Sequence, residues 1–482
     1  MLKLRSLRLS FCASIAAVLA AAVEPAAASP IFPEPAALRT PVKFWKKIFG
    51  VYSKHQIVVH DPENLARVYS VLDFRARAAA GESELVLEIL QREAVARERE
   101  RIRGVLLRLD ARQGNSSGLD DEERKVWDLF GKDKNPRRFA AAADPARIRT
   151  QRGLRERFSE GIRISRRYIA EMEEVFRREG LPVELTRLPL VESCFDIEAY
   201  SKVGAAGIWQ FMPSTGRSYM AIGGVIDERR DPLRATRGAA LHLKENYASL
   251  GSWPLAITAY NHGRAGMHRA VRETGTNDIG QIVRRYKGPL FGFASRNFYA
   301  EFLAALAVER EYKDYFGELQ FDAPFASDEI RLSEALAGHA AAKCAAIPPE
   351  DLAALNPAVD SAVFRGQGNI PRGYLLRVPH GTSGAFQQRL AQIAADARVV
   401  AVPTKSKRVS KKGGAVRTAT RSRDAARGRV AATSDRTHRV RSGQTLSSIA
   451  ERYGVSLSRL RNANGIRGNT VRAGQVLKIP TG

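Results

Sequence analysis

The feature that most constrains the fold is an apolar run that ends in one acidic residue. Residues 184–213 read ELTRLPLVESCFDIEAYSKVGAAGIWQFMP, in which Glu192 closes the run and a glycine and alanine turn leads to Trp209 and Gln210. A carboxyl group held against apolar side chains stays protonated near neutral pH. The stretch therefore predicts a single shielded acid that faces a narrow groove.

The beginning of the chain has the pattern of an export signal. A basic MLKLRSLRLS is followed by a short apolar run and by small residues suited to cleavage near Ala28 and Ser29. We predict a signal peptide at 1–29, with a retained amphipathic anchor as the alternative. No later stretch reaches 18 apolar residues, so we expect no integral membrane span after cleavage and an exported protein of the periplasm or cell envelope.

Two cysteines would remain after cleavage, Cys194 and Cys344. They lie in different predicted modules. We expect two buried, unpaired small side chains, although the sequence alone leaves a disulfide open.

The net charge of +26 predicts polyanionic surroundings. Eleven Lys or Arg residues against two Asp fall within 404–436, so a large share of this charge belongs to a predicted basic flexible linker at 403–436. Because export argues against nucleic acid as a partner, a bacterial envelope rich in carboxylates and phosphates fits the charge better.

Helical periodicity dominates the first two thirds of the chain. Residues 42–145 are predicted as a helical accessory region, with a docking helix and strand at its start and helices over 63–110. A helix is predicted from Arg152 to Gly180, and further helices at 232–250, 254–261, 264–273 and 294–312. Residues 147–315 thus form one predicted all-α domain.

The last third contains two similar patterns. Residues 320–385 have two short helices and a β-like ending in Val-Pro, whereas residues 437–482 read as strand, turn, helix, helix, turn and strand. We predict a complete βααβ module that follows a degenerate copy of itself.

Three separated motifs occur in one order: Glu192-Ser193, GAAGIWQFMP at 204–213 and AYNHG at 259–263. With them the chain resembles the soluble lytic transglycosylase family, most closely its membrane-bound type D branch. Residues 437–480 resemble a LysM domain. The resemblance implies a mainly α protein with a lysozyme-like all-α catalytic domain and a small βααβ LysM module.

The resemblance implies that Glu192 is first the general acid and then the general base. No second carboxylate can be assigned, since Asp196 would share its helix face but fits a turn equally well, and Asp227, Glu228 and Asp231 cannot be placed. In this family the N-acetyl group of the substrate stabilises the cation and its 6-hydroxyl attacks. The implied product is a 1,6-anhydro sugar.

The resemblance also implies the substrate-binding residues. We expect Gly207 to let the backbone approach a sugar, Gln210 to hydrogen-bond it, and Trp209 to anchor the core. Register places the last family tyrosine at Phe298, with a tyrosine one position later, so the choice between the two is open. The predicted set is Ser193, Gly207, Gln210, Tyr260, Asn261 and Tyr299.

In the LysM-like module the two glycan-gripping loops are predicted to contain Gly443, Gln444, Thr445, Leu446, Asn464, Gly465 and Ile466. The copy at 320–385 is too degenerate for us to assign binding. No H-E-x-x-H or other metal pattern occurs, so neither a metal nor another cofactor is expected.

The predicted function is that of an exported peptidoglycan lytic transglycosylase. It would cleave the bond between N-acetylmuramic acid and N-acetylglucosamine, with peptidoglycan glycan strands as its partner and protein partners unknown. A lysozyme-type hydrolase and a non-catalytic peptidoglycan-binding scaffold are the alternatives.

Overall fold

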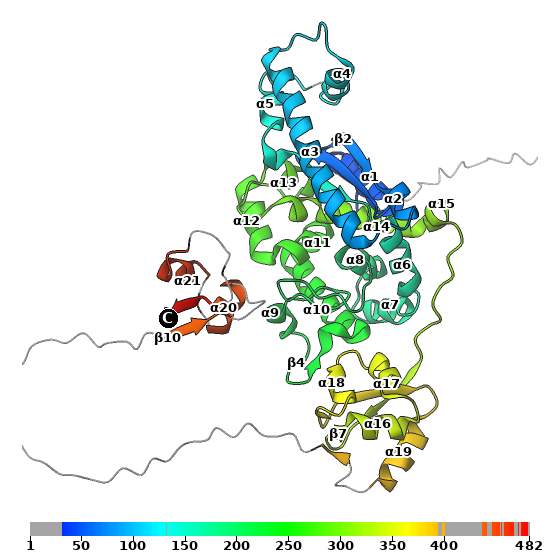
Figure 1. The fold of residues 1–482 in the computed structure, drawn as a ribbon. Coiled ribbons are helices and arrows are strands. Elements are labelled where there is room, and N and C mark those ends of the chain that lie inside the picture. The colour runs from blue at the N-terminus through cyan, green and yellow to red at the C-terminus, as the bar shows by residue number, and fades with distance from the viewer. Residues whose placement is uncertain are drawn as a thin grey trace, which may run out of the picture. The chain divides into compact units, whose positions relative to one another are not determined.

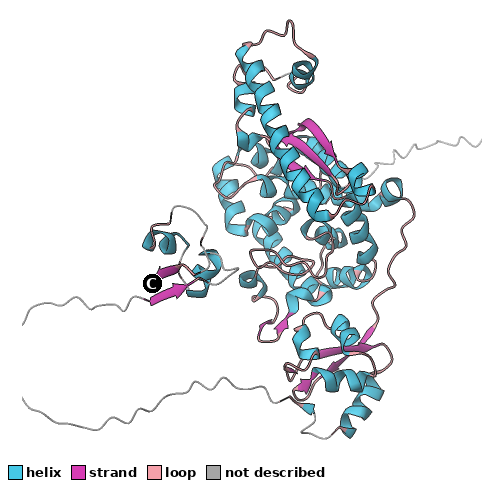
Figure 2. Cartoon of the chain, in the orientation of Figure 1, coloured by secondary structure: helices cyan, strands magenta, loops and turns pink. Residues whose placement is uncertain are grey.

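The computed structural model describes residues 31–131, 133–393 and 398–400, and in the last part of the chain residues 436–440, 446–453, 455, 457–466, 471 and 474–480. The predicted signal peptide and nearly all of the predicted linker lie outside these ranges. The chain divides into two compact units, 1–404 and 405–482, and each is described by itself. Helices predominate and the sheets are small (Figure 2). Among the described residues no helix has the length and apolar character needed to cross a membrane.

The first region combines helices with a small sheet (Figure 1). Its elements are η1 (Ala36–Leu38), α1 (Arg39–Gly50), β1 (Gln56–Asp61), β2 (Asn64–Asp73), α2 (Arg75–Ala79), α3 (Glu84–Ala111), α4 (Asp121–Asp128), α5 (Arg138–Ala142), η2 (Pro145–Arg147) and β3 (Arg149–Arg152). The strands pair antiparallel in the order β2-β1-β3, and β1 is buried along its whole length. The helical prediction for 63–110 is therefore wrong at Asn64–Asp73. There, β-branched and aromatic residues pair with the buried strand instead.

The N-terminal region shares its core with the helical domain rather than standing apart. Helix α1 packs along α14 (Phe293–Arg310), and the Trp45 indole N–H donates to Asn297 at 3.3 Å. The rings of Phe49 and Phe158 stack with their centroids 4.7 Å apart. Truncating this region would therefore expose part of the core of the next one.

The region that follows is all helix apart from a short hairpin. Its elements are α6 (Arg155–Ser165), α7 (Ile169–Arg178), η3 (Val183–Arg187), α8 (Leu188–Glu192), α9 (Pro213–Gly216), β4 (Ile222–Gly223), β5 (Ile226–Asp227), η4 (Glu228–Arg230), α10 (Pro232–Leu250), α11 (Trp253–His262), α12 (Arg264–Thr274), α13 (Ile279–Arg285), α14 and α15 (Tyr312–Phe316).

The helix predicted from Arg152 to Gly180 is interrupted. A turn separates α6 from α7 and lets Tyr168 pack against Phe195 and Phe325, with ring centroids 6.4 and 5.4 Å away. Tertiary packing of one aromatic ring thus overrides the regular apolar spacing. The later helices agree closely with the prediction.

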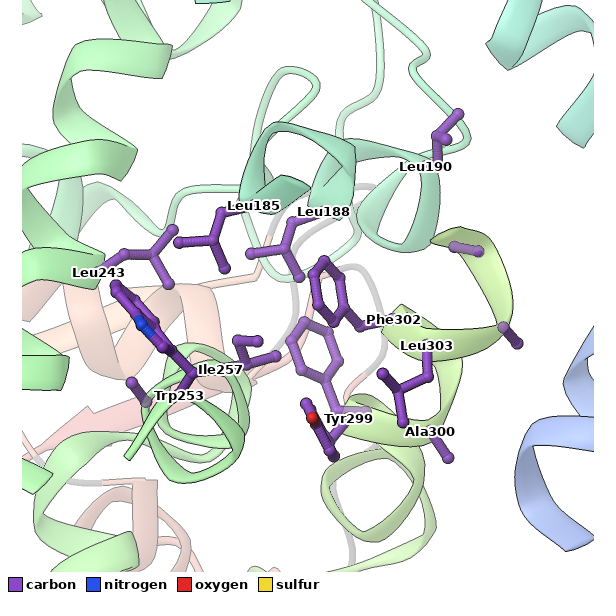
Figure 3. Packing of buried hydrophobic residues seen from close by; sticks show 14 of the residues in the cluster. Leu185, Leu188, Leu190, Leu243, Trp253, Ile257, Tyr299, Ala300, Phe302 and Leu303 are labelled. Atoms are coloured by element: carbon purple, nitrogen blue, oxygen red, sulfur yellow. The ribbon is translucent and has the colours of Figure 1, made fainter. Parts of the chain in front are cut away.

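The core beneath the catalytic candidate is built from α8, α10, α11 and α14. Figure 3 shows Leu185 and Leu188 beside Phe302 of α14 and Ile257 of α11, and all four side chains are fully buried. Burying a side chain of this kind contributes about 1.5–3 kcal/mol, so this cluster fixes where α8 ends.

The segment after Phe325 is a βααβ unit that packs as its own hydrophobic cluster. Its elements are β6 (Ser327–Arg331), β7 (Leu336–Ala337), α16 (Gly338–Ala345), α17 (Pro349–Leu355), α18 (Ser361–Phe364), β8 (Asn369–Ile370), β9 (Leu375–Pro379) and α19 (Ser383–Gln392). Strand β6, which the sequence pattern did not reveal, pairs antiparallel with β9. We call the part from β6 to β9 the first βααβ unit.

The last unit has the predicted order β10 (Arg436–Arg439), α20 (Leu446–Tyr453), α21 (Leu457–Ala463) and β11 (Val476–Ile479), with the two strands antiparallel. Both βααβ units contain the same amide clamp. Asn464 donates to the carbonyls of Leu460 and Lys478 and accepts from the Lys478 N–H. Asn356 makes the same three bonds with Leu352 and Arg377.

Both cysteines in the described part of the chain, Cys194 and Cys344, are buried and unpaired. This confirms the expectation for them.

Candidate active site

Glu192 is the last residue of α8, and its side chain keeps partial contact with solvent. Burial raises the pKa of its carboxyl to about 8. Within the described residues no hydrogen bond or ion pair engages that carboxyl, so nothing compensates for the lost hydration of the charged form. The geometry supplies a carboxylic acid that holds its proton at neutral pH.

The backbone turns sharply after this acid. Cys194 and Phe195 both have positive φ, at 53° and 60°, and Phe195 is fully buried. Because the helix ends at Glu192, Asp196 does not share its face. Asp196 is exposed and accepts the Glu198 backbone N–H at 3.0 Å, which confirms the turn role.

Hydrogen bonds to the backbone hold the following loop beside Glu192. The Ser193 hydroxyl is buried and donates to the Ile208 carbonyl at 3.0 Å. The Gln210 amide donates to the Gly207 carbonyl at 2.8 Å, with φ of Gln210 at 47°. Ser193 thus secures the loop instead of bonding the carboxyl, and the Gln210 amide oxygen stays available.

Gly207 has φ of 72°, and a Cβ at this position would lie 1.8 Å from the Arg229 carbonyl oxygen. Gly207 therefore lacks a side chain because the Arg229 backbone lies so close. The family resemblance predicts that a sugar would lie there instead. Arg229 is the brace of the loop: its buried guanidinium donates to the carbonyls of Gly204 and Phe211, at 2.7 and 2.9 Å, and pairs with Asp227.

Trp209 and Tyr260 pack against each other near Glu192. Trp209 is fully buried and donates to the Thr236 hydroxyl at 2.9 Å, which confirms its core role. The Tyr260 hydroxyl donates to the Trp209 carbonyl at 2.9 Å, and burial together with the charge of Glu192 raises its pKa. Tyr260 is therefore close to the acid. Beside it, burial lowers the pKa of His242 to about 4, so this ring is neutral.

Asn261 lies at the exposed end of α11. Its side-chain oxygen accepts the Ser295 hydroxyl from α14 at 2.8 Å, which leaves the NH2 group directed elsewhere. The structure thus joins Ser193, Gln210 and Tyr260 to the backbone carbonyls of Gly207, Ile208 and Trp209, with Asn261 next to Tyr260 at the end of α11.

The structure corrects the assignment of Tyr299. This side chain is 1% exposed, and its hydroxyl donates to the Pro33 carbonyl at 2.9 Å. Figure 3 shows its ring among the core residues of α14. Phe298 is also buried and has no hydroxyl. Since one residue along a helix rotates the side chain by about 100°, the register shift carries the tyrosine into the core.

A second carboxyl that the sequence analysis missed comes from α14. Glu301 is partly exposed, and burial and the charge of Glu192 raise its pKa to about 8. The signal was present in the sequence, because Glu301 is the single acid in the otherwise apolar run FYAEFLAALAV. Two protonated carboxyls thus lie within electrostatic range of each other.

Among the described residues, no group of three or more His, Cys, Asp or Glu side chains is arranged to hold a metal ion. The site's chemistry is that of protonated carboxyls, amides and a tyrosine hydroxyl.

The predicted glycan-gripping residues of the last unit are only partly described. Gly443, Gln444 and Thr445 lie outside the described residues. Leu446 is fully buried, and Gly465 and Ile466 follow Asn464 of the clamp in the turn after α21.

Comparison with known proteins places these features in families. Residues 171–283 match the Transglycosylase SLT domain, and residues 438–480 match the LysM domain. The chain is 31% identical over 314 residues to membrane-bound lytic murein transglycosylase D of Escherichia coli strain K12. The aligned residues cover 64% of this chain and 62% of that protein. It therefore spans somewhat less than two thirds of that relative.

Two further similarities are more local. Over 43 residues the chain is 46% identical to N-acetylmuramoyl-L-alanine amidase sle1 of Staphylococcus haemolyticus. The aligned residues cover 9% of this chain and 13% of the amidase. The structure of the lytic transglycosylase Slt of Pseudomonas aeruginosa matches with a TM-score of 0.26 and 19% identity, over 32% of this chain and 25% of that one.

Proposed function

We propose that this chain, which combines an SLT transglycosylase domain with a LysM domain, is a peptidoglycan lytic transglycosylase. The observation that carries the proposal is Glu192: a carboxylic acid with a pKa of about 8, free of ion pairs within the described residues and inside the matched SLT segment. Cleavage of a glycosidic bond requires a proton on the leaving oxygen, and this group retains one at neutral pH.

In the proposed reaction Glu192 gives its proton to the oxygen that links N-acetylmuramic acid to N-acetylglucosamine, and the bond from that oxygen to C1 breaks. The 6-hydroxyl oxygen of the same N-acetylmuramic acid then bonds to C1 and returns its proton to Glu192. The product has a 1,6-anhydro end and no water is consumed. Gln210 and Asn261 are our candidates for binding the acetamido and hydroxyl groups, because each amide keeps hydrogen-bonding capacity.

We assign residues 147–315 as the catalytic domain and residues 437–482 as the module that holds the enzyme on the glycan. Residues 1–29 would direct export, and residues 403–436 would tether the two units. A tether raises the effective concentration of substrate at the active site, and its positive charge adds attraction to anionic wall polymers.

The test is digestion of purified peptidoglycan by the wild-type chain and by Glu192→Gln, followed by mass spectrometry of the released products. We expect anhydro ends from the wild type and a rate at least about a hundredfold lower for the variant. Equal digestion by both proteins would refute the role of Glu192. Reducing ends in place of anhydro ends would identify a lysozyme-type hydrolase.

The test also distinguishes a hydrolase from a lytic transglycosylase, because Glu301 offers a candidate second carboxyl group. Hydrolases of glycosidic bonds use two carboxyl groups, and a second one lies within electrostatic range of Glu192. A non-catalytic scaffold would instead bind peptidoglycan and release no soluble product.

A further inference from the structure

The first βααβ unit is attached rigidly to the hairpin β4–β5 of the helical region. The Asp227 N–H donates to the Ala358 carbonyl at 2.7 Å, and the Asp360 N–H donates to the Val225 carbonyl at 2.8 Å. Behind these bonds, Arg377 of β9 forms a buried ion pair with Asp231, whose side chain is fully buried. Backbone bonds and a buried ion pair together give a junction with fixed geometry.

This junction lines an open cavity of about 420 Å³, within the range of about 300–1,000 Å³ that is usual for ligand sites. The hairpin, the turn after α17 and the loop that follows Glu192 all contribute to its wall. We call it the junction cavity, and its main lining residues are Glu198, Tyr200, Asp227, Arg230, Ala358 and Asp360.

Tyr200 presents an aromatic ring to solvent at this cavity. Its side chain is 66% exposed, while its hydroxyl interacts with the braced guanidinium of Arg229 and its backbone bridges to Ala206. Because these contacts restrain the exposed ring, stacking a ligand on it costs little further ordering of the ring. It is suited to stack on the apolar face of a flat, otherwise polar ligand.

The charges around the ring select the kind of ligand. Within the described residues, no hydrogen bond or ion pair occupies the guanidinium of Arg230 or the carboxylate of Glu198, and the Asp360 side chain bonds only to the nearby Ala362 N–H. Asp227 is already neutralised by Arg229. The two carboxylates and the guanidinium are therefore able to accept from and donate to the hydroxyl and acetamido groups of a polar ligand.

We infer that the junction cavity is a second saccharide-binding site, which holds a part of the glycan strand away from the bond that is cut. The inference rests on the proposed function, because it takes the same polymer as ligand. One loop joins the two places: it begins at Ser193 beside Glu192, passes Glu198 and Tyr200 at the cavity, and returns to Ile208, whose carbonyl accepts the Ser193 hydroxyl. A strand bound at the cavity is thereby aligned with the catalytic acid.

The test compares Tyr200→Ala with the wild type in the full chain, using long, peptide-free glycan strands and short oligosaccharides of the same sugars. We expect the ratio of KM for long strands to KM for short oligosaccharides to rise about fivefold. Tyr200→Phe keeps the ring but loses the hydroxyl contact with Arg229, so its ratio should lie between those of the wild type and Tyr200→Ala. Val203→Ala, in the same loop and 73% exposed but outside the cavity lining, is the matched control.

A Tyr200→Ala ratio equal to that of the wild type would overturn the inference and leave the proposed function standing. A loss seen only with strands that carry stem peptides would also overturn it, because the ligand would then be peptide. If the wild type cuts neither kind of glycan, and Glu192→Gln binds neither in calorimetry, the proposed function fails and the inference fails with it.

Discussion

The ionisation of Glu192 should set the upper pH limit of activity. The group must be protonated when the substrate binds, and burial raises its pKa from the ordinary 4.5 to about 8. Activity should therefore persist through neutral pH and decline as the pH rises through about 8. A solvent-exposed glutamate in the same role would already lose activity near its ordinary pKa.

The size of the difference follows from the two pKa values. At pH 7 a group with a pKa of 8 is about nine tenths protonated, whereas a group with a pKa of 4.5 is about 0.3% protonated. Burial thus increases the active fraction at neutral pH by about 300-fold. The apolar surroundings of α8 supply this factor, because no charged partner contributes to the raised pKa of Glu192.

The assay is the initial rate of anhydro-product release from purified peptidoglycan at substrate concentrations well below saturation, where the rate reports the free enzyme, at pH values from about 5 to 9. Binding of Glu192→Gln to the same peptidoglycan, measured by co-sedimentation at each pH, separates attachment from catalysis. The rate should fall about tenfold per pH unit above the midpoint. A midpoint near 4.5–5 with unchanged binding would refute the argument that burial holds the proton.

Three further substitutions test the surroundings of the site. Glu301 binds a proton in the folded state between pH 4.5 and about 8 that the unfolded chain releases, so wild-type stability should decline as pH rises through this window. Glu301→Gln should lose less stability than the wild type over this window, by at most about 1.4 kcal/mol for each pH unit, while the raised pKa of Glu192 still contributes its own loss. A constant gap between the two proteins in urea unfolding at pH 5 and 8 would contradict the reasoning. Arg377→Ala removes one of the two guanidinium groups paired with the buried Asp231 carboxylate, since Arg234 remains, and should lower the free energy of unfolding by about 1.5–3 kcal/mol, whereas loss of less than about 1 kcal/mol would contradict a buried pair. Gly207→Ala should reduce both stability and turnover, because its Cβ would lie 1.8 Å from a carbonyl oxygen. Gly204→Ala is the milder control, because Gly204 has φ of 93° but a Cβ there would meet no atom nearer than 3.9 Å. Equal effects of the two substitutions would show that backbone conformation alone matters.

Long helices and the position of the acid could be predicted from the sequence because both depend on local pattern. Helix α10 begins at Pro232 and ends at Leu250, as the apolar spacing indicates. The acid at 192 follows its apolar run directly. In contrast, the sequence pattern predicts helix where β2 forms, because a strand that pairs with a buried neighbour is defined by a partner distant in the chain.

The neighbours of the acid were only partly predictable for the same reason. The approach of Tyr260 follows from a motif, but the effect of the Glu192 charge on the pKa of Glu301 depends on how α14 packs against α8. The error at Tyr299 is of the same kind. A helix that carries tyrosine one position later turns that ring toward Pro33 and the core, and no local pattern specifies which face of α14 meets the site.

The two βααβ units show why a weak apolar pattern can hide a complete fold. Asn356 and Asn464 each close the turn after the second helix and attach it to the last strand with three hydrogen bonds. The amide clamp and one strand pairing thus recur in both units, each around its own hydrophobic cluster. In the first unit the turn after Asn356 also packs against the β4–β5 hairpin, with Ala358 and Asp360 bonded to it. The first unit therefore keeps the framework of the last one although its sequence pattern is weak.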